Sequence, residues 1–73
     1  MLLPYQERVV IEKQELDDKI DKLEAFLRSE NYQGVDLLNQ QLMMQQLGTM
    51  LAYSAILSRR IETFQQTTKE TNE

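Results

Sequence analysis

The sequence lacks cysteine, histidine and tryptophan, and it has one proline and two glycines in 73 residues. Without cysteine no disulfide can form, and without cysteine or histidine there is no cluster typical of a structural zinc site. Catalysis would have to rest on carboxylates alone. Asp17, Asp18 and Asp21 lie among lysines, which is the ordinary composition of an exposed helix face. We therefore expect no enzyme, no metal and no cofactor.

A chain of this length has room for one thin hydrophobic core, because a domain of about 60 residues buries only about 60% of the surface that it exposes when unfolded. Small domains compensate with disulfides, metals or oligomerisation. The first two are missing here. The sequence therefore predicts a protein that completes its core by assembling with copies of itself.

The formal net charge is −4, so no overall positive field attracts the chain to DNA or RNA, whose binding depends on neutralising many phosphates. We expect no nucleic-acid partner. A compact anionic ligand remains possible, because a few arginines or lysines from several subunits can form a locally positive pocket on an acidic protein.

The first half of the chain predicts an amphipathic helix from Glu7 to Ser29. Its apolar residues recur at intervals of three and four, and Lys13 fills the one remaining slot of the repeat formed by Val9, Leu16, Ile20, Leu23 and Leu27. The acids and lysines on the other faces are typical of a solvated surface with i,i+4 pairs. Turn-forming residues from Ser29 to Gly34 then predict a bend between two antiparallel helices.

The second helix is expected from Val35 to about Phe64. One apolar stripe is formed by Leu38, Leu42, Met50, Tyr53, Leu57, Ile61 and Phe64. A second apolar set lies on another face and comprises Met43, Leu47, Leu51 and Ala55, with Met44 and Ile56 beside them. One partner helix cannot cover both faces. Another backbone can approach closely at the small residues Gly48, Ala52, Ser54 and Ala55.

The fold class predicted from these patterns is all-α, a two-helix antiparallel hairpin that assembles into a homo-oligomeric helical bundle. Residues 1–64 would form the single domain, with a short N-terminal arm, and residues 65–73 a frayed tail without apolar side chains to bury. Residues 37–58 carry no charge, but polar residues are spread through them, so we expect no membrane span. Residues 1–4 lack the features of a signal peptide, which favours the cytoplasm.

Two features stand apart from these helical patterns. Arg59 and Arg60 end the long uncharged stretch, either as cations placed near a helix C-terminus or as an anion site. Tyr5 follows Pro4 on the expected arm, where it could pack across a neighbouring subunit or stack on a nucleobase. The residues alone leave both alternatives open in each case.

A longer pattern links the two expected helices and covers about Pro4 to Phe64. It runs Arg8-Val9-Val10, Glu12-Lys13, Glu15-Leu16-Asp17, Lys19-Ile20, Lys22-Leu23 and Phe26-Leu27, followed by Gln46, Met50, Tyr53, Ile56-Leu57 and Arg60-Ile61. This pattern resembles the viral anti-CBASS sponges, short phage proteins that share a helical hairpin with a Thoeris anti-defence protein. The resemblance implies a homo-hexamer in the host bacterial cytoplasm that sequesters cyclic oligonucleotide second messengers without cleaving them.

The resemblance also implies two kinds of ligand site. In the first, an N-terminal aromatic stacks on a base of a cyclic dinucleotide and a first-helix lysine of another subunit meets a phosphate. Tyr5 matches the aromatic and Lys19 or Lys22 the lysine, and Arg8 is assigned to the same site. In the second, a symmetry-repeated arginine faces a cyclic trinucleotide, and Arg60 matches it, with Arg59 beside it. The alternative is a helical adaptor that binds a host or phage protein through the second helix.

Overall fold

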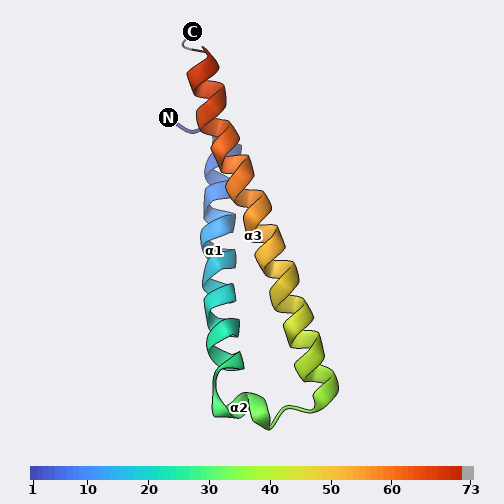
Figure 1. Cartoon of the computed structure of the whole chain (residues 1–73). Coiled ribbons are helices and arrows are strands. Elements are labelled where there is room, and N and C mark those ends of the chain that lie inside the picture. Colours follow the sequence, from blue (N-terminus) through green and yellow to red (C-terminus); the bar gives the residue numbers. More distant parts are fainter. Residues whose placement is uncertain (72–73) are drawn as a thin grey trace.

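The computed structural model describes the backbone of residues 1–71 and the side chains of residues 1–64. Its helices are α1 (Pro4–Leu27), α2 (Glu30–Gln33) and α3 (Leu37–Thr71). The long helices α1 and α3 run in opposite directions and α2 lies in the connection between them (Figure 1). Every regular element among residues 1–71 is a helix, which confirms the all-α class. The second helix was predicted to end near Phe64, but α3 continues to Thr71. Of the predicted frayed tail, residues 65–73, the side chains and the last two residues lie outside the described part of the chain.

Helix α1 begins at Pro4, three residues before the predicted start at Glu7. Proline suits the first helical position because its fixed φ fits the helix and its missing N–H would have no helical partner there. The Gln6 side chain accepts a hydrogen bond from the backbone N–H of Leu3 at 2.8 Å. Tyr5 therefore lies in the first turn of α1, and the expectation that it sits on an arm outside the helix is wrong.

The connection between the long helices is held by hydrogen bonds from side chains to backbone carbonyls. Ser29 Oγ donates to the carbonyl of Phe26 at 2.6 Å, where α1 ends. From α3, the amide of Gln40 donates to the carbonyls of Tyr32 and Val35, both at 3.0 Å. The carbonyls of Phe26 and Tyr32 also accept backbone N–H groups, at 3.0 and 3.1 Å, so these side chains reinforce turns that the backbone already closes. The predicted bend contains a short helix of its own, α2.

Helix α3 begins behind Asp36, whose carboxylate accepts a hydrogen bond from the backbone N–H of Asn39 at 3.2 Å. The Asn39 side-chain amide also donates to Asp36, at 2.9 and 3.1 Å. These hydrogen bonds from Asn39 hold the pKa of Asp36 below its ordinary value. A carboxylate in this place accepts an otherwise unpaired N–H and complements the helix dipole.

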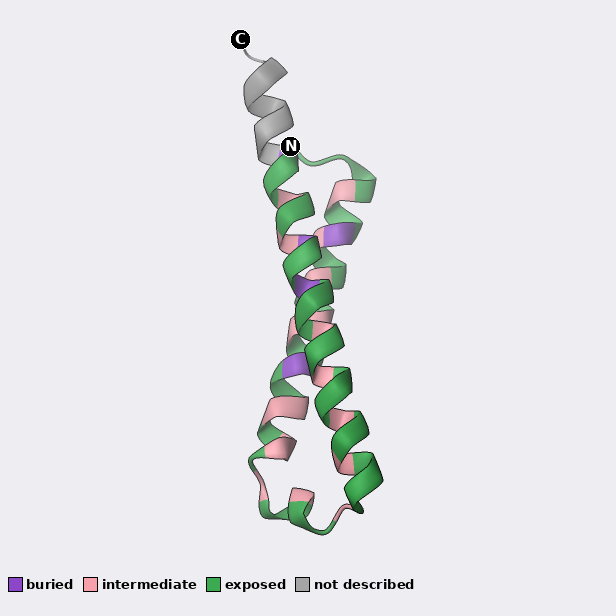
Figure 2. Cartoon of the chain, turned by 45° about the vertical axis from the view of Figure 1, so that its right-hand side comes forward, coloured by how far each residue is buried: buried purple, intermediate pink, exposed green. Residues whose placement is uncertain are grey.

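The core lies between α1 and α3 and is small. Its buried apolar side chains are Val9, Ile20, Leu57 and Phe64. Leu57 is completely buried, and Leu16 and Ile61 pack against the cluster. No residue of the connection is buried, and the two long helices separate toward it (Figures 1 and 2). The tightest packing is therefore in the half of the molecule away from the loop.

The face of α3 that meets α1 differs from the predicted stripe. Apart from Gln40 near the loop and Ser58, its less exposed residues keep a spacing of four and three: Met43, Leu47, Met50, Ser54, Leu57, Ile61 and Phe64. Leu38, Leu42 and Tyr53, which the prediction placed on this stripe, are 63%, 48% and 42% exposed. The predicted stripe jumped eight residues from Leu42 to Met50, and eight residues turn a helix about 80° past two full turns. A straight partner helix such as α1 therefore contacts the regularly spaced stripe from Met43 to Phe64, and the predicted stripe is wrong.

Nowhere in the described part of the chain is a helix both long and apolar enough to cross a membrane. The same residues hold no group of three or more acidic, histidine or cysteine side chains that could bind a metal ion.

Candidate functional site

The end of the molecule away from the loop gathers aromatic and basic side chains from both long helices. The rings of Tyr5 on α1 and Phe64 on α3 meet edge to face, with centroids 5.8 Å apart and planes at 82°. Phe64 is 7% exposed, whereas Tyr5 is 48% exposed. Phe64 therefore supports one side of the tyrosine ring, and about half of the Tyr5 side chain stays exposed.

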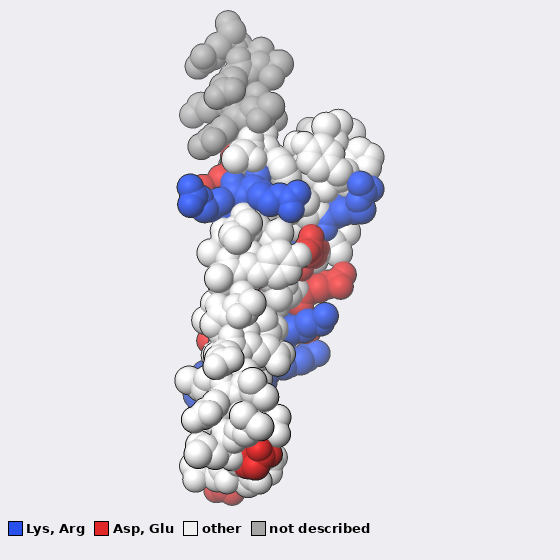
Figure 3. All heavy atoms as spheres, turned by 90° about the vertical axis from the view of Figure 1, so that its right-hand side faces the viewer, with Lys and Arg blue, Asp and Glu red and all other residues white. Residues whose placement is uncertain are grey.

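Arginines flank this ring pair on both helices. Arg8 lies one turn after Tyr5 on α1, and Arg60 lies one turn before Phe64 on α3. Both arginines and the neighbouring Arg59 are exposed. Figure 3 shows Lys and Arg forming a band at this end of the molecule, above a long uncharged face of α3. The structure therefore brings together four of the predicted site residues: Tyr5, Arg8, Arg59 and Arg60.

Arg59 and Arg60 are not cations at a helix end. Helix α3 continues to Thr71, eleven residues beyond Arg60, whereas the helix dipole acts on charges within the last turn. Neither guanidinium forms an ion pair with any residue of the described part of the chain. Their placement is therefore not explained by stabilisation of the helix, and both remain available to an anion.

Lys19 and Lys22 lie apart from this end. Lys19 is fourteen residues after Tyr5, which is about 21 Å along a helix axis. Both lysines border a shallow open depression on α1, together with Gln14, Glu15 and Asp18. Lys22 Nζ pairs with Asp18 at 3.0 Å, an exposed i,i+4 ion pair that contributes little to stability. Within the described residues Lys19 forms no ion pair, although Glu15 is at the predicted i,i+4 position.

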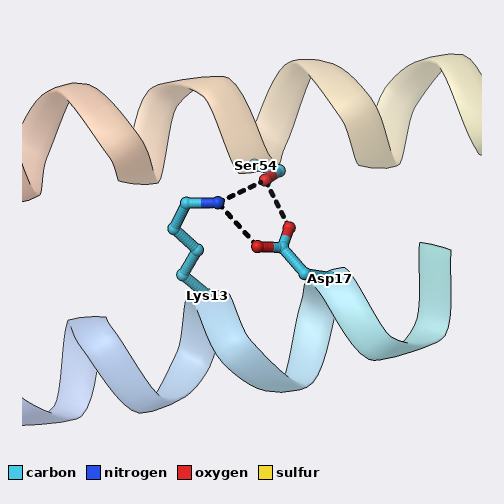
Figure 4. Close-up of polar contacts among 3 residues, drawn as sticks. All are labelled: Lys13, Asp17 and Ser54. Atoms are coloured by element: carbon cyan, nitrogen blue, oxygen red, sulfur yellow. Dashed lines mark hydrogen bonds and ion pairs between the residues drawn. The ribbon is translucent and has the colours of Figure 1, made fainter. Parts of the chain in front are cut away.

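A polar triad that the sequence did not predict lies between α1 and α3 (Figure 4). Lys13 Nζ contacts Asp17 Oδ2 at 2.6 Å and donates to Ser54 Oγ at 3.1 Å. Ser54 Oγ donates to Asp17 Oδ1 at 2.6 Å. Hydrogen bonds from Lys13 and then Ser54 hold the pKa of Asp17 below its ordinary value. Ser54 is 9% exposed, so α1 occupies the space where a second backbone was expected.

The sequence held a signal for this triad. Lys13 was identified as the one polar residue in an apolar repeat, and Ser54 occupies the same kind of slot in the inward stripe of α3. Two polar slots at matching places in two helices indicate that they face each other. The support that Phe64 gives to Tyr5 had no comparable signal, because Tyr5 was expected outside the helix.

Comparison with known proteins gives one family and one relative. The family model described as Sequestin matches residues 3–63. The chain is 36% identical over 63 residues to the uncharacterized 7.5 kDa protein in the denB-rIIB intergenic region of Enterobacteria phage T4. That match covers 86% of this chain and 98% of the phage protein. No solved structure matches the chain.

Proposed function

The chain belongs to the Sequestin family, the phage anti-CBASS sponges, and from this we propose that it sequesters cyclic oligonucleotide second messengers in the infected host cell without cleaving them. The family match over residues 3–63 is the observation that carries the proposal. It takes in Tyr5, Arg8 and Arg60, the side chains gathered at one end of the molecule, together with Lys19. Sequestration would lower the concentration of free messenger, so the defence effectors of the host would not be activated.

The proposed working form is a homo-oligomer of helical hairpins, with a hexamer as its size. The chain exposes 5900 Å², whereas a compact folded protein of this mass exposes about 4,700 Å². Large apolar side chains are exposed on faces of α3 that α1 does not cover: Leu38, Leu42, Met44, Leu51, Tyr53 and Ile56. Apolar patches of this kind mark interaction surfaces. A second copy carries the same uncharged face, so copies can cover one another without burying charge.

The proposed dinucleotide site is shared between copies. Tyr5 offers a supported, half-exposed ring for stacking on a base, and Arg8 on the next turn adds a positive charge. The lysine that meets a phosphate lies too far along α1 to come from the same chain. It must therefore come from a neighbour. We assign it to Lys19 rather than Lys22, because the ammonium of Lys22 already pairs with Asp18.

The proposed trinucleotide site uses Arg60, with Arg59 beside it. Copies of Arg60 around a symmetry axis would present one guanidinium to each phosphate of a three-fold ligand. Charge-assisted hydrogen bonds are about twice as strong as neutral ones, and an arginine can bind phosphate through two of them. The absence of an ion pair at Arg60 among the described residues leaves its donors available for this contact.

Calorimetric titration of the purified protein with cyclic dinucleotides and trinucleotides tests both sites. Tyr5→Ala should weaken dinucleotide binding about fivefold or more, because stacking on an aromatic ring is worth about 1–3 kcal/mol per base. Lys19→Glu should weaken it too, and Lys22→Glu is its matched control. Arg60→Ala should weaken trinucleotide binding by a larger factor, since symmetry repeats the loss.

Oligomer mass is measured on every variant, so that lost assembly is not mistaken for lost binding. A Tyr5→Ala variant that assembles and binds dinucleotides as tightly as the parent would contradict the stacking site. Bound ligand is then released by heat and separated by chromatography. Its recovery intact is expected of a sponge, whereas a linear product that accumulates with time would show hydrolysis and overturn the proposal.

A further inference from the structure

The inward stripes of α1 and α3 are built alike. Each follows alternating steps of three and four residues, and each contains one polar residue among apolar ones. On α1 the stripe is Val9, Lys13, Leu16, Ile20, Leu23 and Leu27, and on α3 it is the regular stripe from Met43 to Phe64. The two polar residues, Lys13 and Ser54, face each other and join through a hydrogen bond of 3.1 Å.

We propose that Lys13, Asp17 and Ser54 form an alignment key, which determines the face of α3 that turns toward α1 and the residues of the two helices that meet. Figure 4 shows the three side chains closing a ring of contacts across the gap between the helices. Among the described side chains other than Thr63 and Phe64, these are the hydrogen bonds that join α1 to α3, and no ion pair joins the two helices. The key is therefore the polar contact that determines which residues of α1 and α3 meet.

Other alignments of the two helices take Ser54 away from Lys13 and Asp17, whose own i,i+4 ion pair lies within α1 and would remain. A turn of α3 by one residue, about 100°, would place Tyr53 or Ala55 opposite Lys13. A slide by one seven-residue repeat would place Leu47 or Ile61 there. The Lys13 side chain is only 24% exposed, so it would press its charge against apolar groups without the hydroxyl that now accepts from it. Polar groups buried in this way are costly.

Apolar packing alone distinguishes these alignments weakly. Leu42, Tyr53 and Ile56 each precede an inward residue of α3 by one position. A rotation of α3 by one residue, about 100°, would therefore bring these apolar residues to face α1. The loop limits sliding of α3 as a whole, because Gln40 is bonded to Tyr32 and Val35 and a helix moves along its axis as one body. Rotation of α3 about its axis is opposed at the loop by these hydrogen bonds rather than by packing against α1, because the helices separate there (Figure 1).

The alignment has two consequences at the surface. It sets Phe64 beneath Tyr5, and it leaves Leu42, Tyr53 and Ile56 on the outside of the pair. The value of that outer face for assembly rests on the proposed function, whereas the alignment itself does not. A single polar residue in an apolar seam is known to specify register in coiled coils at some loss of stability. The key should act in the same way, adding specificity more than stability.

Distances between two spin labels within one chain report the alignment directly. The chain has no cysteine, so labels attach only at Glu12→Cys on α1 and Gln45→Cys on α3, both exposed positions. Labelled protein is mixed with excess unlabelled protein, so that only pairs within one chain are measured. The background with an intact key should give a single distance. Lys13→Met with Ser54→Ala removes the hydrogen bonds of the key at nearly constant volume and should give several distances, because a rotation of α3 carries the label at position 45 around the helix axis.

Two controls separate the key from ordinary packing. Lys13→Arg keeps a cation and its donors, and Leu23→Met changes an inward residue outside the key, so both should retain the single distance. Several distances in Leu23→Met would show that any inward change loosens the pairing, and would overturn the proposal. A single unchanged distance in Lys13→Met with Ser54→Ala would overturn it as well.

Thermal unfolding of the same variants gives the second measurement. The variant without the key should melt within about 5 °C of the parent or above it, because its replacements are apolar and similar in size and the Asp17 carboxylate, 43% exposed, can turn to water. A larger fall, or failure to fold, would make the triad an ordinary stabilising contact and overturn the proposal. No ligand is used in either measurement, so failure here is distinct from failure of the sponge function.

Discussion

The inward and outward faces of α3 are both rich in apolar residues, but only one has a partner within the chain. The inward face carries Leu57 and Phe64, which α1 buries, and a single polar residue, Ser54, which α1 satisfies. The outward face carries Leu51 and Ile56, 46% and 56% exposed. One face of α3 is therefore covered by α1. The other face has a similar composition, and only another molecule could cover it.

The largest expected effect comes from placing a charge on the outward face. Ala52→Glu adds a carboxylate one turn from Ile56, and burying it against another copy would be costly because no cation is near in the uncharged stretch. We expect the mass by light scattering to fall toward the 8.6 kDa of one chain, and helical circular dichroism to fall with it, since the small core needs assembly.

Glu12→Gln on α1 is the control for a change of one charge, and it should leave the mass unaltered. An Ala52→Glu protein that keeps both the parent's mass and its helicity would show that the outward face stays open to water. The outward face of α3 would then be an exposed apolar surface and not an interface between copies.

Truncation of one leucine on each face gives the next largest effect. Leu57→Ala should lower the free energy of unfolding by about 2–5 kcal/mol, because Leu57 is fully buried and leaves a cavity. Leu51→Ala should cost about 1 kcal/mol or more if another copy covers it, and close to nothing if it remains exposed. Urea unfolding at one fixed protein concentration measures both. Equal stability of Leu51→Ala and the parent would contradict a covered outward face.

The sequence determined the elements better than it determined their faces. The spacing of Val9, Ile20 and Leu27 located α1, and the turn residues after Ser29 located the connection, because local periodicity and turn chemistry suffice for both. The inward face of α3 was mixed with the outward one, since apolar residues occur on both and only the partner helix decides between them. Which face of α3 packs against α1 depends on tertiary contacts, and the local sequence of α3 does not specify it.

The candidate site shows the same division. Arg59 and Arg60 stood out because they follow a long uncharged stretch, and the structure removes the helix-end explanation by extending α3 beyond them. Tyr5 was identified, but its support by Phe64 joins residues 59 positions apart, and no local pattern specifies that contact. Lys13 was seen as a polar slot, although its partner Ser54 required the pairing of the helices to be known.

The smallest expected effect is the response to acid, which compares the contact between the helices with the loop. The pKa of Asp17 and the pKa of Asp36 are both below the ordinary value. A carboxyl with a lowered folded pKa contributes stability above its unfolded pKa of about 4, and the contribution is lost as the pH falls through the lower folded pKa. Stability should therefore decline in the acid range below about pH 4 as both groups take up protons.

The two carboxylates should not contribute equally to this decline. Asp17 bonds to Ser54, 37 residues away, so its contacts vanish when the helices part, whereas Asp36 bonds to Asn39 three residues on and can keep that contact in a locally helical unfolded chain. Urea midpoints from pH 7 to pH 3 should therefore depend less on pH in Asp17→Asn than in Asp36→Asn. The reverse order would place the acid-sensitive contact in the loop, and would mean that the triad between the helices adds nothing that depends on the charge of Asp17.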